Sequence, residues 1–433
     1  MSLASVSRME AKLLLPTYER QPILFVRGRG VYLWDSRGKR YLDFLSGIGV
    51  NALGYNHPAI QAAIKRQARR LIHVSNLFFH EYQAELARLL TEISGLDRAF
   101  FCNSGTEAWE GALKLARAFA QMNNTNGHKP KFKRNPKTRI LAMENSFHGR
   151  TFGALATTGQ PKYRAPFAPL VPGVTFVKFN DLDDLQRKFD ASVCAVCIET
   201  IQGEGGIRPV SPEFLELARR LTKRSGALLV LDEIQCGLGR TGRHFAYQHY
   251  GVLPDVIAVA KPLAGGLPLG AILTTERVAK CMHPGLHGTT FGGGPLACAV
   301  AIEFLRAEKK LLKHVRPLGE YFHAELKALK KDKKHQSIRE VRGMGLMQAV
   351  EVDSPELAKA VARQLLQEGI IINRTHETVL RFLPPYVIQK KHVDQVVKAL
   401  DAALHKNAES PQKRKHEKKR TAPPRRKGVH AHA

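Results

Sequence analysis

The chain has 433 residues, 44% of them hydrophobic, which is enough for two or three domains and excludes a chain that is disordered throughout. Its formal net charge is +29. Residues 406–433 contain ten Lys or Arg against two acids and have no apolar periodicity, so they predict a disordered basic tail that carries +8 and leaves +21 on the rest. A basic surface favours anionic substrates, but no base-reading motif with interleaved aromatic residues supports a nucleic-acid partner.

The N-terminal residues are interrupted by Arg8, Glu10 and Lys12, which argues against a secretory signal, and no run of about 18 apolar residues predicts a membrane helix. Six cysteines in so long a chain do not form a disulfide framework, so we expect a reducing, cytoplasmic setting. Cys194 and Cys197 have C-x-x-C spacing, but the apolar run around them predicts a strand, on which residues three apart point to opposite faces. We therefore expect no metal site and no redox pair.

In chain order, residues 31–44 alternate around a Ser-Arg-Gly-Lys turn and predict a hairpin. Residues 57–73 and 81–93 carry apolar residues at helical spacing. We assign residues 1–50, the N-terminal arm with its hairpin, to the same small domain as the C-terminal part of the chain.

Residues 51–300 repeat short apolar runs that are followed by helical patterns. Strands such as ALLVL (residues 227–231) are continuously apolar, which is typical of strands covered on both faces. This region predicts a large α/β domain with a mainly parallel sheet.

Beyond residue 300 the pattern changes to a Lys-rich helix around residues 321–331, several short strands, and a final helix over residues 392–405. We expect a smaller α+β domain over residues 301–405, with its boundary within about ten residues of position 300.

Three features of the large domain suggest chemistry. Ser104, Gly105 and Thr106 lie between a strand and a helix, where free N–H groups and hydroxyls form an anion site, although the same pattern is typical of a simple helix N-cap. Asp232 and Lys261 each follow an apolar strand, at the edge where open α/β sheets place their ligands. A lone lysine there often reaches solvent, because a buried ammonium is costly. Together, the amine, the carboxylate and the anion site match what pyridoxal phosphate needs.

Residues 237–242 have the glycine spacing of a dinucleotide-binding loop, which would indicate a nicotinamide enzyme. However, Asp232 to Cys236 separate these glycines from the strand, the residues after Gly242 do not predict a helix, and no acid follows about 20 residues later. We interpret the glycines as a flexible loop that leaves the strand carrying Asp232.

The sequence resembles the class III aminotransferases over residues 12–405, through six motifs in the expected order. These are Ser104-Gly105-Thr106, Phe147-His148-Gly149-Arg150-Thr151, Gln202-Gly203-Glu204-Gly205-Gly206, Leu231-Asp232-Glu233-Ile234-Gln235, Ala260-Lys261 and His287-Gly288-Thr289-Thr290-Phe291-Gly292-Gly293. The resemblance implies a fold-type I pyridoxal-phosphate enzyme. Within the family, PTYERQP, SGIGVNALG and RFLPP are most similar to the members that act on N-acetylornithine, a step of arginine biosynthesis.

The resemblance also implies roles at the cofactor. Lys261 would bind the cofactor covalently and then carry the substrate proton, while Asp232 would pair with the ring nitrogen. Gln235 would lie near the phenolic oxygen, and Phe147 would stack on the ring. Ser104, Gly105 and Thr106 would bind the phosphate, and Thr290 would complete this phosphate site from the second subunit of a homodimer.

For the substrates, the resemblance implies that Arg381 grips the α-carboxylate and that Glu204 pairs with Arg381 and releases it to admit 2-oxoglutarate. A bidentate carboxylate suits a buried guanidinium, although a structural salt bridge would serve as well. Arg150 would contact the acylated diamino acid, with Thr289 nearby. Ile48 stands where ornithine aminotransferases tend to have a tyrosine, and an apolar residue suits an N-acylated donor.

The chain departs from the family pattern at Thr200, where proline is usual, at Gly294, where asparagine is usual, and at Trp109, where a smaller polar residue is common. Two other interpretations remain open from the sequence. One is a different amine donor of the same class: ornithine, succinylornithine, 4-aminobutyrate, or an N-acetylated or carrier-linked lysine. The other is a non-catalytic polyanion-binding protein on the same scaffold, suggested by the net charge.

Overall fold

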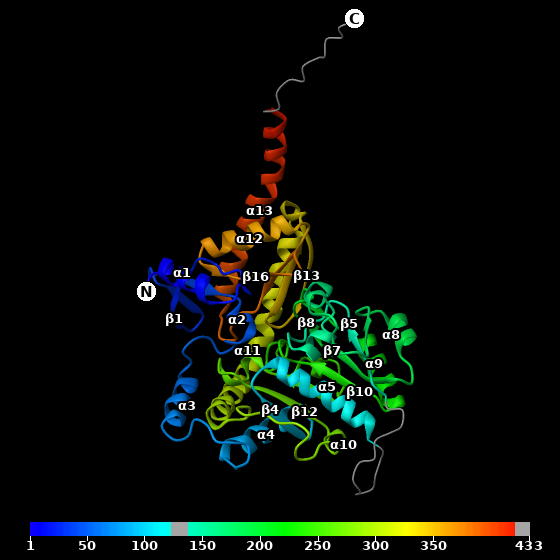
Figure 1. Ribbon diagram of the computed structural model, residues 1–433. Helices are drawn as coiled ribbons and strands as arrows, with labels where there is room; N and C mark the ends of the chain where they lie inside the picture. Colours follow the sequence, from blue (N-terminus) through cyan, green and yellow to red (C-terminus); the bar gives the residue numbers. More distant parts are fainter. Residues whose placement is uncertain (123–136, 421–433) are drawn as a thin grey trace, which may run out of the picture.

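The computed structural model describes residues 1–122 and 137–420, and its centre is a seven-stranded sheet (Figure 1). The strand order is β4 (Arg98–Cys102), β12 (Gly270–Thr274), β11 (Val256–Val259), β10 (Leu228–Asp232), β7 (Val193–Glu199), β5 (Arg139–Met143) and β6 (Val174–Val177). Only β12 runs antiparallel to its neighbours in this sheet. The predicted α/β fold with a mainly parallel sheet is confirmed.

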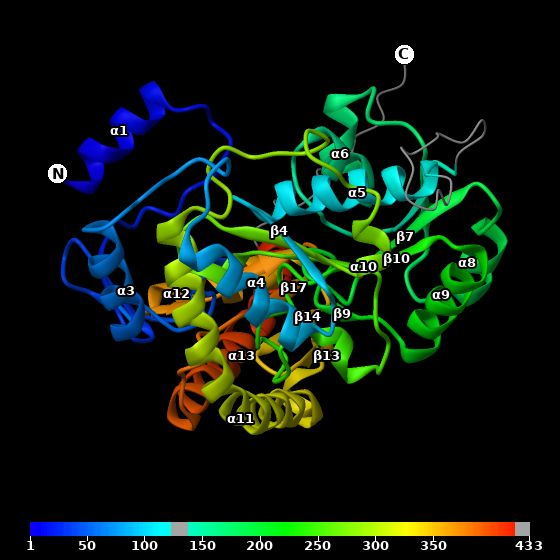
Figure 2. The same ribbon diagram turned by 90° about the horizontal axis from the view of Figure 1, so that it is seen from below.

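Helices cover both faces of this sheet because its strands are apolar on both sides. Every residue of β10 is buried, and alternate residues enter different core clusters. Leu228 and Val230 pack with residues of α5 (Gly105–Gln121), whereas Leu229 and Leu231 pack with residues of α9 (Pro212–Ser225). Figure 2 shows α5 on one side of the sheet and α9 on the other.

Several short elements surround this core. They are α3 (Pro58–Ala68), α4 (Glu81–Ser94), α6 (Phe152–Thr157), α7 (Pro161–Arg164), α8 (Leu182–Lys188), α10 (Glu276–Ala279), β8 (Ile201–Gln202) and β9 (Arg208–Pro209). The two predicted helices over residues 57–73 and 81–93 correspond to α3 and α4. Among the described residues, no helix has both the length and the apolar character needed to cross a bilayer.

The rest of the chain forms two four-stranded sheets. One contains β1 (Phe25–Arg29), β2 (Tyr32–Asp35), β3 (Arg40–Asp43) and β15 (Ile370–Ile371), and the other contains β13 (Ile338–Met344), β14 (Met347–Val352), β17 (Val379–Phe382) and β16 (Asn373–Thr375). The predicted hairpin is present as β2 and β3. Because β15 pairs in parallel with β3, the N-terminal sheet is completed by the C-terminal part of the chain.

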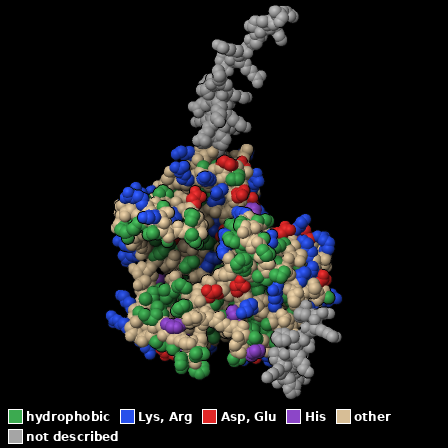
Figure 3. All heavy atoms as spheres, viewed as in Figure 1, with side chains coloured by type: hydrophobic (Ala, Val, Ile, Leu, Met, Phe, Trp, Pro, Cys, Tyr) green, Lys and Arg blue, Asp and Glu red, His purple; other side chains and the backbone are tan. Residues whose placement is uncertain are grey.

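Long helices join and cover these units. Helix α11 (Pro295–Lys331) packs against α3 and α4 and also against β13 and α13 (Lys390–Arg420), so the boundary expected near residue 300 falls inside a continuous helix. The chain also includes α1 (Leu3–Leu13), α2 (Ser46–Gly49) and α12 (Pro355–Gln367). Lys and Arg side chains gather on the surface around α12, at the upper left of the view (Figure 3).

Helix α13 corrects the predicted start of the disordered tail. The final helix was expected to end at residue 405, but it continues to Arg420. Lys, Arg, Glu and Gln dominate residues 406–420 and have favourable helix propensity, so charge alone did not end the helix. The remainder of the predicted tail, residues 421–433, lies outside the described residues.

Strand β7 corrects the geometry expected for the C-x-x-C pair. A register shift between β5 and β7 skips Cys194, so Cys194 and Cys197 lie in the same core cluster rather than on opposite faces. Both residues are free thiols, and burial raises the pKa of Cys194 to about 11 and the pKa of Cys197 above its usual value. Among the side chains that the structure describes, no group of three metal-ligating residues is found.

The glycine-rich stretch after β10 is buried, which corrects the expectation of a flexible loop. Gly239 and Gly242 have φ of 93° and 87°, which glycine tolerates best. Between them, the buried Arg240 guanidinium donates to the carbonyl oxygens of Leu346 at 3.2 Å and Pro384 at 2.5 Å. The loop therefore connects the large domain to the small sheets. A dinucleotide-binding loop would lead directly into a helix, but only a short 3₁₀ turn (Ala246–His249) follows this one.

Candidate active site

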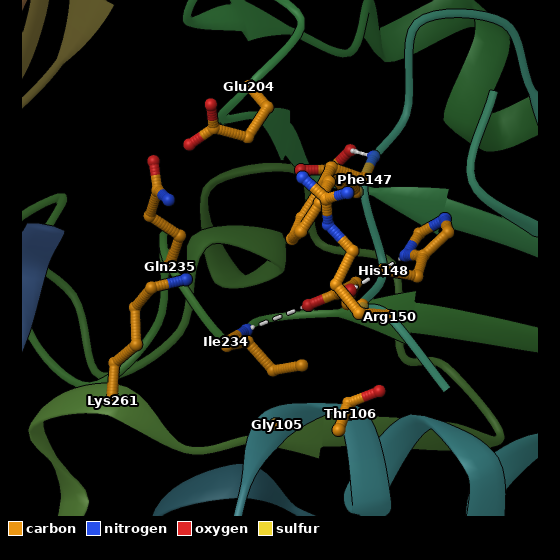
Figure 4. Close-up of a pocket in the computed structure, with 12 residues that line it drawn as sticks. Gly105, Thr106, Phe147, His148, Arg150, Glu204, Ile234, Gln235 and Lys261 are labelled. Carbon is orange, nitrogen blue, oxygen red and sulfur yellow. Dashed lines mark hydrogen bonds and ion pairs between the residues drawn. The ribbon is translucent and has the colours of Figure 1, made fainter. Parts of the chain in front are cut away.

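A cavity of about 300 Å³ opens at the carboxyl ends of the parallel strands. Figure 4 shows Lys261 and Gln235 on one side of it, Phe147, His148 and Arg150 on the other, and Gly105 and Thr106 below. The remaining lining residues are Gly149, Glu199, Glu204, Asp232 and Ile234. Strand ends and the start of one helix thus bring together residues that are up to 156 positions apart, from Gly105 to Lys261.

Lys261 supplies the amine of this cavity. It is the first residue of a 3₁₀ turn that follows β11, and its φ of 37° is unusual for a residue with a side chain. Burial lowers the pKa of the Lys261 amine, an effect that the negative charges of Asp232 and Glu204 oppose. A lowered pKa increases the neutral fraction of the amine, which is the form that acts as a nucleophile and base.

Asp232 is held by two hydrogen bonds. Its Oδ2 accepts from Nδ1 of His148 at 2.7 Å, and its Oδ1 accepts from the backbone N–H of Ile234 at 3.0 Å. The side chains of Asp232 and His148 are both buried. The carboxylate is therefore fixed in direction at the cavity wall. Sequence reasoning assigned no role to His148, since only the tertiary structure brings it to the end of β10.

Glu199 is a further wall residue that sequence reasoning missed. Its carboxyl accepts backbone N–H groups from Phe147 at 2.8 Å and from Gly203 at 2.9 Å. Burial, followed by the nearby Asp232 charge, raises the pKa of Glu199 to about 8. Glu199 thus anchors the loop that carries Phe147. An acid at the end of a fully apolar strand was the same signal that identified Asp232.

The departure at Thr200 also has a structural explanation. Its hydroxyl donates to Oε1 of the buried Glu233 at 2.7 Å, a bond that proline could not make. Glu233 accepts as well from the backbone N–H groups of Ala246 and Tyr247. This network secures the loop after β10 without touching the cavity.

The N-terminus of α5 forms the floor of the cavity. Gly105 and Thr106 line it, and the first N–H groups of a helix have no partner within the helix. A side chain at position 105 would have its Cβ 2.9 Å from Cγ2 of Ile234, so glycine allows the Asp232 loop to approach. The Ser104 hydroxyl caps the helix by accepting from the N–H of Glu107 at 3.3 Å and does not line the cavity, so its predicted contact with the phosphate remains a prediction.

Arg381 lies behind the cavity wall, on β17. Its Nη1 donates to Oε1 of Glu204 at 2.6 Å and to Oε1 of Gln235 at 3.3 Å, and the side chain is 1% exposed. Glu204 and Gln235 line the cavity and cover the guanidinium. Burial acts to raise the pKa of Glu204, but the charges of Arg381 and Lys261 bring it below its usual value.

Arg150 is the exposed cation of the site. Its guanidinium lies 4.0 Å from the ring centroid of Tyr163 and 5.5 Å from that of Phe147. Within the described parts of the chain, it forms no salt bridge. Arg150 is thus placed to receive a carboxylate from a ligand, which Arg381 could receive only after Glu204 moved.

Thr289 and Thr290 do not reach this cavity in the single chain. They line a separate hollow of about 320 Å³, where the Thr289 hydroxyl accepts from Asn103 at 3.3 Å. Ile48 is 37% exposed and is not among the lining residues, although the adjacent Gly49 lies close to the Lys261 side chain. The predicted roles of these three residues remain predictions.

Comparison with known proteins decides the family. The family model described as "Aminotransferase class-III" matches residues 15–404. The chain is a class III aminotransferase. Two acetylornithine aminotransferases, from Caldanaerobacter subterraneus subsp. tengcongensis and Aquifex aeolicus, are each 46% identical to it; the matches cover 91% and 90% of the chain and 98% and 99% of those relatives. The crystal structure of ornithine aminotransferase from Toxoplasma gondii ME49 matches with a TM-score of 0.88 at 33% identity, covering 95% of the chain and 96% of that structure.

The residues of this class III aminotransferase fit pyridoxal phosphate, the cofactor of the family. A buried amine with a lowered pKa faces a fixed carboxylate, and the open end of a helix lies beneath both. The predictions of the family and the cofactor are confirmed. Because Lys261 and Asp232 are both in place, nothing in the site favours a non-catalytic polyanion-binding protein.

Proposed function

We propose that this aminotransferase moves the terminal amino group of N2-acetyl-L-ornithine to 2-oxoglutarate in two half-reactions. The observation that supports this most directly is the pair of arginines, one uncovered and one covered. Arg150 is available to the first carboxylate substrate, while Arg381 is neutralised by Glu204 at 2.6 Å. The names of the relatives at 46% identity favour the acetylated donor.

In this proposal, pyridoxal phosphate, when bound, supplies the electron sink that stabilises negative charge on the substrate carbon. The chain supplies the rest. Asp232 would hold a positive charge at the ring nitrogen, and the first N–H groups of α5 with Thr106 would bind the phosphate. Lys261 Nζ would accept the proton from the substrate carbon that bears the amino group and would hold it until it is returned.

The exchange at Arg381 separates the two half-reactions. The amine donor presents one carboxylate, which suits the uncovered Arg150. 2-Oxoglutarate carries two carboxylates, and the second one requires Arg381 to be released from Glu204. A bidentate pair between a guanidinium and a carboxylate is strong enough to compensate for that release.

The donor is tested by a panel of amines with 2-oxoglutarate. The panel contains N-acetylornithine, succinylornithine, ornithine, 4-aminobutyrate and N-acetyl-lysine, with formation of glutamate as the measurement. We expect the highest kcat/KM for N-acetylornithine. Turnover of ornithine without turnover of N-acetylornithine would instead match the name of the Toxoplasma gondii structure and reject the proposed donor.

We also propose a homodimer in which Thr290 completes the phosphate site of the opposite subunit. Large apolar side chains support a covered surface: Leu77, Phe78, Phe79 and Phe291 are 87%, 66%, 106% and 67% exposed. Mixing Lys261→Ala with Thr290→Ala chains tests the arrangement. If sites are shared, hybrid dimers regain one intact site and activity rises above that of either parent; a monomer in light scattering would reject the dimer.

The six unpaired cysteines further support a cytoplasmic location.

A further inference from the structure

Trp109 lies directly behind the wall of the active site. It belongs to α5, and its side chain is fully buried. Its ring stacks on the imidazole of His148, with the ring centroids 3.9 Å apart and the ring planes at 5°. Two aromatic planes this close and this parallel restrict each other's rotation.

The contacts of His148 explain why this stacking matters. Nδ1 is bonded to Oδ2 of Asp232 at 2.7 Å, whereas Nε2 is buried and has no hydrogen-bond partner among the described residues. One hydrogen bond alone leaves an imidazole free to rock about that bond. The ring plane is therefore held mainly by the indole.

The indole is itself anchored from the opposite side. Its Nε1 donates to the hydroxyl of Thr157 at 2.8 Å, and Thr157 is fully buried in α6. A continuous series of contacts thus runs from Thr157 through Trp109 and His148 to Asp232. A small residue at position 109 would leave an opening beside His148 that water could enter, and water would weaken the electrostatic effect of Asp232.

We propose that Trp109 is a positioning residue, which acts through the imidazole of His148 to hold the Asp232 carboxylate in the direction of the cofactor's ring nitrogen. This inference rests on the role proposed above for Asp232. It requires an aromatic ring at position 109, not only bulk.

The test uses the full-length enzyme and three substitutions. Trp109→Leu keeps apolar bulk and removes the ring, and Trp109→Phe keeps a ring. Leu115→Ala is a matched control because Leu115 is buried in the same helix, six positions from Trp109. The readouts are the thermal midpoint, the Kd for pyridoxal phosphate, and kcat and KM measured separately. For Trp109→Leu we expect Kd to rise and kcat to fall by about tenfold each, the lower end of what outer-shell partners contribute, with KM changed less than about twofold.

Trp109→Phe should recover most of both losses, and Leu115→Ala should lower the thermal midpoint without changing Kd. Equal Kd and kcat in Trp109→Leu and in the unaltered enzyme, at a lower thermal midpoint, would show that Trp109 is only structural. If Trp109→Leu does not fold, Thr157→Val decides: it removes the acceptor of the indole N–H, and an unchanged Kd there would overturn the proposal. Asp232→Ala, measured in parallel, distinguishes failure of the Trp109 proposal from failure of the role proposed for Asp232. An unchanged Kd for pyridoxal phosphate in that variant would reject the role of Asp232 itself.

Discussion

The cofactor end and the substrate end of the cavity are built differently. Asp232 and Glu199 end the adjacent strands β10 and β7 and are paired in the sheet, and Lys261 begins the turn after the neighbouring strand β11, so one sheet edge positions all three. The substrate end combines two large-domain loops, one carrying Arg150 and the other Glu204, with Arg381 on a strand of the small sheets. A sheet edge tolerates little movement, whereas an ion pair between separate units can open. The chemistry is therefore placed on the rigid part and the substrate exchange on the adjustable part.

Lys261→Ala gives the largest expected effect at the rigid end. Removal of the amine eliminates both the covalent attachment of the cofactor and the proton carrier, so we expect turnover to fall by more than about 10³-fold. Borohydride treatment followed by mass spectrometry should no longer find cofactor bound to the chain. Lys280→Ala, an exposed lysine, is the control and should change neither result.

Arg381→Ala tests the adjustable end. We expect kcat/KM for 2-oxoglutarate to fall by about 10²-fold, because a bidentate carboxylate contact is lost. Glu204, whose side chain is 25% exposed, also loses its partner, which destabilises the fold by about 1–3 kcal/mol, and Glu204→Gln in the same chain should restore part of that loss. Steady-state kinetics and denaturant unfolding measure the two effects. Arg374→Ala on the neighbouring strand should leave both nearly unchanged.

Glu199→Gln separates charge from hydrogen bonding at the rigid end. The pKa of Glu199 is raised to about 8, so the group is mostly neutral at pH 7. A folded pKa above the unfolded value gives a contribution to stability that is complete at low pH and is lost as the pH rises through about 8. We expect the variant's free energy of unfolding to be lower by about 1 kcal/mol at pH 7, since the amide offers one acceptor oxygen instead of two. We also expect its stability to decline less as the pH rises from about 6 to 8. Unfolding curves from pH 6 to about 9 measure this, and parallel pH profiles of the two proteins would contradict it.

Ser104→Ala has the smallest expected effect and concerns the helix start. Because the hydroxyl caps α5 and does not line the cavity, we expect a loss of about 1 kcal/mol in the free energy of unfolding and a Kd for pyridoxal phosphate within about threefold of the original. Thermal unfolding and cofactor titration give the two values. A tenfold weaker Kd with unchanged stability would instead support the role that the sequence predicted for Ser104.

The sequence by itself determined the mainly parallel large sheet, the hairpin of β2 and β3, and the position of Asp232 and Lys261 at strand ends that line one cavity. These follow from local patterns: continuously apolar strands have to be covered on both faces, and a charged residue directly after such a strand has to lie at its end. The family motifs then added Glu204 with Arg381, which the fold joins at 2.6 Å. All of these features depend on residues close in sequence or on a known pattern.

Only the tertiary structure decided which side chains support the residues of the cavity. His148 reaches Asp232 from 84 positions away, and Trp109 covers His148 from another element, contacts that no periodicity encodes. The irregular register of β7 placed two cysteines together, and the glycines after β10 became a buried link between domains through Arg240. Sequence patterns report which face of an element is apolar, but the partner that covers a polar group depends on the packing of distant elements, because burial and hydrogen bonding are properties of the assembled fold.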